Sequence, residues 1–193
     1  MIKTKADLKY YLKRDAIALK KSNKKRPSII GDEIWKFQRT MRKLEYLSSL
    51  KGLKRKLHIV CYALTKLKYK RLSLKLGFSI PINVFEEGLC ITHYGSIVIN
   101  SKAKIGKNCK IGEGVNIGAT DGSDKAPVIG DNVFIATGVK IIGDVSIADD
   151  VQIGANAVVV KSISEKGCTY AGIPAKKISD NNSRANLTKE LFI

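Results

Sequence analysis

The stretch VIGDNVFIATGVKIIGDVSIADDVQIG, residues 128–154, decides the fold. Isoleucine recurs in it every six residues, and valine stands two positions before each isoleucine of the series from Ile135 to Ile153. The spacing extends outward in both directions, with one interruption. The positions in phase are Ile99, Ile105, Ile111, Ile117, Ile129, Ile135, Ile141, Ile147, Ile153 and Val159.

A six-residue period fits neither an α-helix nor one long strand, whose side chains repeat every 3.6 and every two residues. It is typical of a short strand and a corner, repeated three times in each coil of a triangular prism. Glycine, asparagine and aspartate at the corners supply the turns. We expect residues 18 apart to stack, so that one ladder contains Ile99, Ile117, Ile135 and Ile153.

The interruption is the polar segment Thr120–Pro127. Because glycine, proline and two aspartates fit poorly inside a prism, we interpret it as an external loop over the site. The step from Ile117 to Ile129 equals two whole repeats, so a regular but polar repeat is the alternative.

The first part of the chain has a helical rhythm. Residues 5–21 form one expected helix, and a second begins near Asp32. A third, 53–76, ends at Gly77 and carries an apolar series of Leu57, Val60, Leu64, Leu67 and Leu72. The sequence therefore predicts an α + β fold. Its parts are a basic α-helical domain (1–76), a β-helix domain (77–178) and a C-terminal tail (179–193).

The net charge of +18 is confined to the helical part. Residues 1–78 contain 23 Lys/Arg and 5 Asp/Glu, whereas the remainder is balanced. Such a block could bind nucleic acid or an anionic membrane surface. No nucleic-acid-binding motif accompanies it, so we favour a solvated helical face and expect no nucleic-acid partner.

Cysteine and histidine usage argues against a metal site. The four cysteines are far apart, and the chain has only two histidines, His58 and His93. This pattern favours a reducing cytoplasm over a disulfide framework. No apolar run is long enough for a signal peptide or a membrane span, so we expect no integral membrane segment.

The repeat, the segment THYGSIVIN (92–100) and the segment AGIPAKKI (171–178) together resemble the hexapeptide-repeat acyltransferases, most closely the serine O-acetyltransferase branch. The resemblance covers residues 77–178. It implies a left-handed parallel β-helix, a homotrimer and acetyl-CoA as co-substrate, without a metal.

The resemblance also implies that His93 is the general base. An imidazole can accept a proton from an acceptor hydroxyl near neutral pH and return it to the leaving thiolate. The family's orienting aspartate aligns with Ser79, and Thr92 replaces an acidic residue before the base. Ser79, the backbone or Glu87, one repeat before His93, could orient the imidazole. Thr92 and Lys125 are the expected substrate-binding residues. The segment Lys125–Val128 replaces a second histidine of the family, and Lys125 alone keeps the positive charge expected to meet a substrate carboxylate.

Small residues mark the expected coenzyme A groove, because a pantetheine arm needs close approach to backbone amides. The pairs Gly118–Ala119, Ala136–Thr137 and Gly154–Ala155 recur every 18 residues, which places them on one corner of successive coils. Small corner residues are also what the coil itself demands. Lys161 and Lys176 could meet coenzyme A phosphates or be ordinary surface lysines.

Three functions remain open from the sequence. The first is serine O-acetylation. The final Ile193 supports it, because the resembling enzymes insert a terminal isoleucine into the cysteine synthase with which they pair. The second is O-acetylation of a sugar or polysaccharide precursor, favoured by the lost acidic and histidine positions. The third is a non-enzymatic scaffold.

Overall fold

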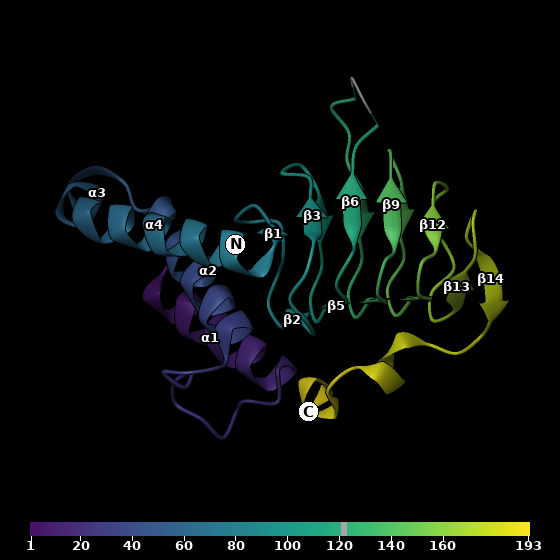
Figure 1. Ribbon diagram of the computed structural model, residues 1–193, viewed down its shortest axis with the longest axis horizontal. Coiled ribbons are helices and arrows are strands. Elements are labelled where there is room, and N and C mark those ends of the chain that lie inside the picture. Colours follow the sequence, from purple (N-terminus) through teal and green to yellow (C-terminus); the bar gives the residue numbers. More distant parts are fainter. Residues whose placement is uncertain (121–122) are drawn as a thin grey trace.

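The computed structural model describes residues 1–120 and 123–193. Helices gather at one end, a coiled stack of short strands follows, and the tail returns beside the first helix (Figure 1). The predicted order, a helical part followed by a β-helix of parallel strands, is confirmed. The division into separate domains stays a prediction, because one apolar core runs from α2 into the coils.

The helical part has four α-helices where we expected three. The first begins with a capping box, in which Thr4 and Asp7 each accept a hydrogen bond from the other's backbone N–H. The last ends as predicted at Gly77, whose φ of +76° is the left-handed conformation that glycine favours. The bounds are α1 Lys5–Ala18, α2 Glu33–Ser49, α3 Gly52–Leu57 and α4 Ile59–Leu76.

The expected third helix is divided at His58. This residue has φ −105° and ψ 11°, and its Nδ1 lies 2.9 Å from the carbonyl oxygen of Lys54. No residue of α3 is buried, so nothing packs against this segment to keep it in line with α4.

The apolar series predicted for this helix faces outward. Thr65, Ser73 and Leu76 are buried residues of α4, which packs mainly on α2. Four of the five predicted positions are exposed instead: Leu57, Val60, Leu64 and Leu67. Only Leu72 packs against the core.

The coils have three faces, each a parallel sheet. Face A contains β1, β3, β6, β9 and β12; face B contains β4, β7 and β10; face C contains β2, β5, β8, β11, β13 and the antiparallel β14. The strands are β1 Phe78–Ser79, β2 Cys90–Ile91, β3 Ile97–Ile99, β4 Lys104–Ile105, β5 Lys110–Ile111, β6 Asn116–Gly118, β7 Val128–Ile129, β8 Phe134–Ile135, β9 Lys140–Ile142, β10 Ser146–Ile147, β11 Gln152–Ile153, β12 Val158–Val159, β13 Thr169–Ala171 and β14 Lys176–Ser179. The tail adds 3-10 helices η1 Ser183–Asn186 and η2 Lys189–Phe192.

The stacking register corrects one prediction. Ile99 pairs with Ile117 as expected, but Ile117 pairs with Ile141 rather than with Ile135. Ile135 stands on face C, between Ile111 and Ile153. The predicted ladder of Ile99, Ile117, Ile135 and Ile153 is therefore wrong at its middle step, from Ile117 to Ile135, while its first and last steps are confirmed.

The cause is the interrupted segment. Across it, pairing residues lie 24 positions apart on all three faces, as in Ile105 with Ile129, whereas Ile135 and Ile153 are 18 apart. The segment Thr120–Pro127 therefore adds length without adding a face of the coil, and the polar-repeat alternative is wrong. Asp121 and Gly122 of this expected loop lie outside the described residues.

One row of corner side chains ties the coils together. The Nδ2 of Asn108 donates to Asn132 over 2.8 Å, and the Nδ2 of Asn132 donates to Asp150 over 2.9 Å. Arg14 of α1 donates to Asn108 at one end, and Arg184 of η1 donates to Asp150 at the other. The row thus links α1 and the tail through three coils.

Candidate functional site

His93 occupies an enlarged corner between faces C and A. Seven positions separate Ile91 from Val98, whereas five separate Ile111 and Asn116, which pair with them in the next coil. Two additional residues thus make this corner bulge. The side chain of His93 is exposed, and no hydrogen bond to it occurs among the described residues. Its imidazole is free to meet a ligand.

Glu113 lies against the same corner on the next coil. A Cβ atom added to Gly95 would come 3.2 Å from the Cβ of Glu113. The Oε2 of Glu113 is buried and has no hydrogen-bond partner within the described parts of the chain. Such atoms are rare in folded proteins, since an unpaired buried carboxylate oxygen is costly.

Sequence reasoning missed Glu113, although a signal was present. Glu113 follows His93 by 20 residues, and 20 is also the distance between the paired residues Ile91 and Ile111. The enlarged coil hid the match, because the regular repeat has spacings of 6 and 18 residues.

The two side chains expected to orient His93 differ in position. Ser79 is exposed on face A, paired with Val98 just after the His93 corner. Glu87 is buried at the corner between faces B and C. Its Oε1 accepts a hydrogen bond from Tyr10 over 3.4 Å and lies 3.6 Å from the Nζ of Lys107. The structure therefore does not bring Glu87 to His93.

Thr92 and Lys125 already have partners. The Thr92 hydroxyl donates to the carbonyl oxygen of Ile111 over 3.2 Å, on the coil that follows. Lys125 Nζ lies 2.7 Å from Asp144, and hydrogen bonding to this carboxylate raises the pKa of Lys125. Both groups of Lys125–Asp144 are well exposed, so a substrate anion would compete with Asp144 in water.

The small-residue pairs do not share one corner, which corrects the sequence-based placement. Ala136–Thr137 and Gly154–Ala155 follow paired strands of face C, on the edge between faces C and A that also carries His93. Gly118 belongs to face A and pairs with Ile142, so Gly118–Ala119 lie on the edge between faces A and B. The loop insertion shifted them by one repeat.

The coil itself explains part of the glycine pattern. A Cβ atom at Gly112 would come 2.7 Å from the backbone nitrogen of Thr137, and one at Gly154 would come 3.0 Å from the Cβ of Ala171. At Gly118 the nearest atoms are side-chain atoms of Asn116 and Ile142, at 3.3 and 3.5 Å. Coil packing therefore demands glycine less strictly at 118 than at 112.

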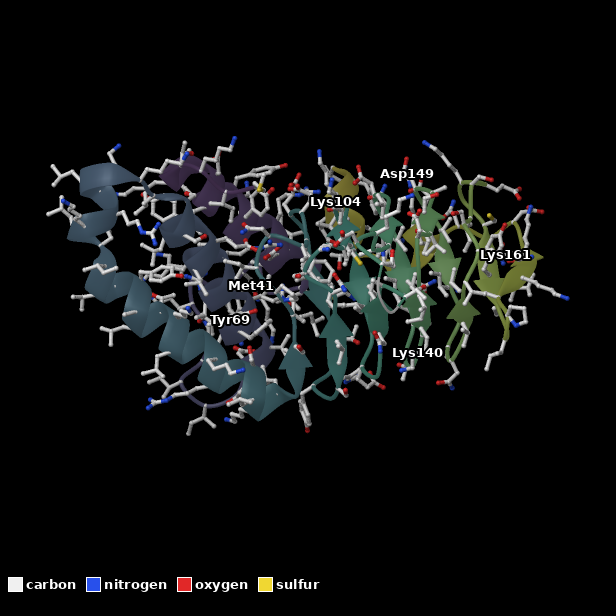
Figure 2. All side chains as sticks on the ribbon, turned by 90° about the horizontal axis from the view of Figure 1, so that it is seen from above. Met41, Tyr69, Lys104, Lys140, Asp149 and Lys161 are labelled. Atoms are coloured by element: carbon white, nitrogen blue, oxygen red, sulfur yellow. The ribbon has the colours of Figure 1, made fainter. Side chains whose placement is uncertain are left out.

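Lys161 and Lys176 are exposed near the far end of the coils. Lys161 follows β12 of face A and lies at the end opposite Met41 and Tyr69 of the helical part (Figure 2). Lys176 begins β14, after a turn in which Ala175 donates to the carbonyl oxygen of Val158 over 2.8 Å. Figure 2 also shows Lys140 on the coils between these regions, where its Nζ donates to Gly114.

The described residues contain no group of three or more His, Cys, Asp or Glu arranged to hold a metal ion. A search of their helices also found none with both the length and the apolar character needed to cross a bilayer. Burial raises the pKa of Cys90, on the strand before His93, to about 11. Its thiol is therefore protonated near neutral pH.

Known proteins resemble this chain first in its repeat and its fold. Residues 126–161 match the family model "Bacterial transferase hexapeptide (six repeats)". The fold is that of solved hexapeptide-repeat proteins with helices before a left-handed β-helix, which confirms the predicted hand. A serine acetyltransferase from Brucella abortus with coenzyme A superposes with a TM-score of 0.72 at 22% identity, over 92% of this chain and 70% of that one. The soybean serine acetyltransferase apoenzyme superposes with a TM-score of 0.66 at 22% identity, over 90% and 69%.

The particular proteins that the sequence resembles are serine acetyltransferases, as predicted. The enzyme of Staphylococcus xylosus is 38% identical over 102 residues, which is 52% of this chain and 47% of that protein. The enzyme of Staphylococcus epidermidis is 41% identical over 103 residues, with the same shares. The chain thus spans about half the length of the curated relatives it matches.

Proposed function

We propose that the protein is an acetyl-CoA-dependent O-acetyltransferase and that serine is its acceptor. The observation that carries the proposal is the exposed imidazole of His93 on an enlarged corner of a β-helix that resembles serine acetyltransferases. Acetyl-CoA supplies the acyl group as a thioester. No metal takes part in this mechanism.

The chemistry needs one group that accepts a proton and then returns it. The neutral imidazole of His93 takes the proton of the acceptor hydroxyl while that oxygen attacks the thioester carbonyl carbon. The carbon–sulfur bond then breaks, and the imidazolium gives its proton to the leaving thiolate. The protonated state of Cys90 disfavours a covalent route through that thiol, so we propose direct transfer.

Glu113 is the proposed positioning residue for His93, in place of Glu87. Its buried, unpartnered Oε2 and its closeness to Gly95 support this role. A carboxylate that accepts the imidazole N–H would fix the tautomer and stabilise the imidazolium that forms. Ser79, exposed beside Val98 on face A, remains a candidate for the acceptor side of the site.

The coenzyme A groove is proposed to run along face A. His93, Ala136, Thr137, Gly154 and Ala155 lie on one edge of this face. The second edge carries Gly118, Ala119 and Lys161, and Lys176 lies beyond the last coil. One pantetheine arm cannot follow both edges of a single prism. We therefore propose a homotrimer, in which one edge of a protomer faces the other edge of its neighbour. The residues of the two edges would then line the same groove.

One observation favours a second acceptor class. Thr92 and Lys125, the residues proposed to hold serine, are bonded to Ile111 and Asp144. An uncharged sugar hydroxyl would not need to displace Asp144. Thiol release measured with serine, and then with a panel of sugars, distinguishes the two acceptors.

Replacement of His93 tests the mechanism, and the chain offers a matched control. His93→Ala should lower turnover about 100-fold or more while coenzyme A binding persists. His58→Ala removes the other histidine, which lies in the helical part, and should leave turnover unchanged. Equal turnover of the wild-type protein and His93→Ala would refute the general-base assignment.

A cytoplasmic location and a cysteine synthase partner complete the proposal. Cys61, Cys90, Cys109 and Cys168 are free thiols, which supports a reducing compartment. Ile193 is fully exposed, while Leu191 is buried and its carbonyl oxygen accepts a hydrogen bond from Arg14. Deletion of Ile193 should abolish binding to a cysteine synthase; unchanged binding would remove Ile193 from the interface.

A further inference from the structure

The outer surface of α3 and α4 carries an apolar stripe that nothing in the described chain covers. Within each helix its residues are separated by three, four or seven positions, so Leu53 and Leu57 share one side of α3, and Val60, Leu64, Leu67 and Leu74 share one side of α4. Each is between 49% and 74% exposed. The stripe consists of Leu53, Leu57, Val60, Leu64, Leu67 and Leu74.

The same two helices are strongly cationic. Residues 52–76 contain eight Lys/Arg and no Asp/Glu. Successive helical residues lie about 100° apart, so Lys68 flanks the stripe on one side and Lys70 on the other. Arg71 lies within the stripe, between Leu67 and Leu74. All three side chains are exposed.

Further positive charge lies beside this surface. A groove of about 1400 Å³ separates α1, α2 and α4, and Lys68 lines it together with Lys9, Lys13, Arg39 and Lys43. The helical part is thus cationic around an apolar surface. Figure 1 shows α4 along one side of the helical part, with its C-terminal end reaching β1 of the coils.

We propose that the stripe and its flanking cations dock the protein on an anionic lipid surface. A helix that lies in a membrane interface needs an apolar side to enter the acyl boundary and lysines beside it to meet the headgroup phosphates. The outer surface of α3 and α4 has both. This proposal does not rest on the proposed acetyltransferase activity.

The charge distribution argues against the other occupants. Two copies paired through this surface would bring together Lys68, Lys70 and Arg71 of both chains, and α3 and α4 contain no carboxylate to offset them; such like-charge contacts cost several kcal/mol. Nucleic acid would satisfy the lysines and leave the leucines in water, because its backbone offers phosphates and no apolar surface. An anionic bilayer satisfies both.

Sedimentation with vesicles tests the proposal on the full chain. Binding is measured to vesicles of phosphatidylcholine alone and to vesicles that also contain phosphatidylglycerol. We expect binding to the second kind only, weakening as salt rises. Lys68→Gln with Lys70→Gln should weaken it about 30-fold, from roughly 1 kcal/mol for each cation. Leu64→Ser with Leu67→Ser should weaken it at least about tenfold.

Control variants place the same kinds of change elsewhere. Ile178→Ser replaces an exposed apolar residue of β14, and Lys104→Gln with Lys189→Gln removes two exposed cations outside the helical part. Both controls should bind as the wild type does. Circular dichroism and thermal unfolding verify that every variant folds, which is expected because the replaced side chains are exposed.

Three results would overturn the proposal. Equal binding to both kinds of vesicle would show that the lysines play no part. If the wild type does not bind vesicles and a leucine variant changes the oligomeric state measured by sedimentation velocity, the stripe is an interface with a second copy. If the protein does not bind vesicles but binds duplex DNA in a salt-sensitive way, and the leucine variant binds DNA as well as the wild type, the cations serve a nucleic-acid partner.

Discussion

Arg42 of α2 and Asp15 of α1 form a buried ion pair, with the Nε of Arg42 2.8 Å from the Oδ2 of Asp15. Arg42 also donates to the carbonyl oxygens of Phe85 and Glu86, and Asp15 accepts from the backbone of Gly88 and Leu89. Burial alone would lower the pKa of Arg42, but the neighbouring carboxylates outweigh it and raise that pKa. The pair therefore fastens two helices to the first coil.

Loss of one partner should destabilise the protein strongly. Arg42→Met leaves the Asp15 carboxylate buried without its cation, so the free energy of unfolding should fall by about 3–5 kcal/mol. Urea unfolding measures it. Arg39→Met, on the same helix and only half-buried, should change it by less than about 1 kcal/mol. Similar losses in both variants would contradict a special role for the ion pair.

Asp32 should make stability depend on pH in acid. Hydrogen bonds from Lys21 and from the Ser28 backbone lower the pKa of Asp32 to about 2, from an ordinary value of 3.8. A carboxyl group with a lowered folded-state pKa stabilises the protein above its unfolded-state pKa. That contribution is lost as the pH falls from about 4 through 2.

The test compares wild type with Asp32→Asn. Asparagine also tolerates the left-handed backbone of this position, where φ is +54°. The wild type should be the more stable protein at pH 5, and the difference should shrink towards pH 2. A difference that is constant across this range would show that the Asp32 charge contributes nothing.

Glu113→Gln should lower the rate while the protein stays folded. The amide carries no negative charge, so the imidazolium that forms at His93 would lose the stabilisation proposed for Glu113. We expect kcat to fall about 10- to 100-fold with little change in the KM for acetyl-CoA. Glu190→Gln, at an exposed position of the tail, is the control. A loss of turnover that only follows a loss of thermal stability would indicate a purely structural role.

Gly95→Ala should disturb the His93 corner from the backbone. Gly95 has φ +138°, and the new methyl group would meet the Cβ of Glu113 at 3.2 Å. Turnover should fall at least about tenfold, because a small displacement of a catalytic group is costly. Gly31→Ala, also at positive φ (+81°) but with no atom within 4 Å, should leave turnover intact. Equal turnover in both variants would contradict the close packing at this corner.

Cys90 should be unreactive in the folded protein. With its pKa raised to about 11, its thiol has little thiolate at pH 8. A disulfide reagent should modify it only after denaturant is added, and Cys90→Ser should keep full turnover. Rapid modification of Cys90 in the native protein, followed by loss of activity, would reopen the acyl-thiol route.

The six-residue isoleucine period identified the β-helix because it reports a local geometry. Each isoleucine points into the prism from the same local unit, a short strand and a corner. The pattern can therefore be recognised in the sequence without knowledge of contacts between distant residues. The helical part was also recognisable, and Gly77 ends its last helix as expected. The exposed position of His93 does not follow from this spacing, which would place residue 93 in phase with the buried Ile99; the two additional residues between Ile91 and Val98 turn it outward.

The direction of α4 was not accessible from the sequence. Its leucines were expected to mark the packed side, yet Thr65 and Ser73 face inward and Leu64 and Leu67 face water. Periodicity shows that residues share a side of a helix, but not which side the rest of the protein covers. Only the packing of α4 on α2 shows which side of α4 is exposed to solvent.

By itself, the sequence determined the fold class and the strand period, because each depends on residues close together in the chain. Only the tertiary structure decided that Ile117 stacks on Ile141, that Gly118 and Gly154 lie on different edges, and that Glu113 rather than Glu87 lies against the corner that carries Gly95. The reason is physical. Two additional residues in one corner and six in one loop shift every later contact between coils, while the local pattern continues unchanged.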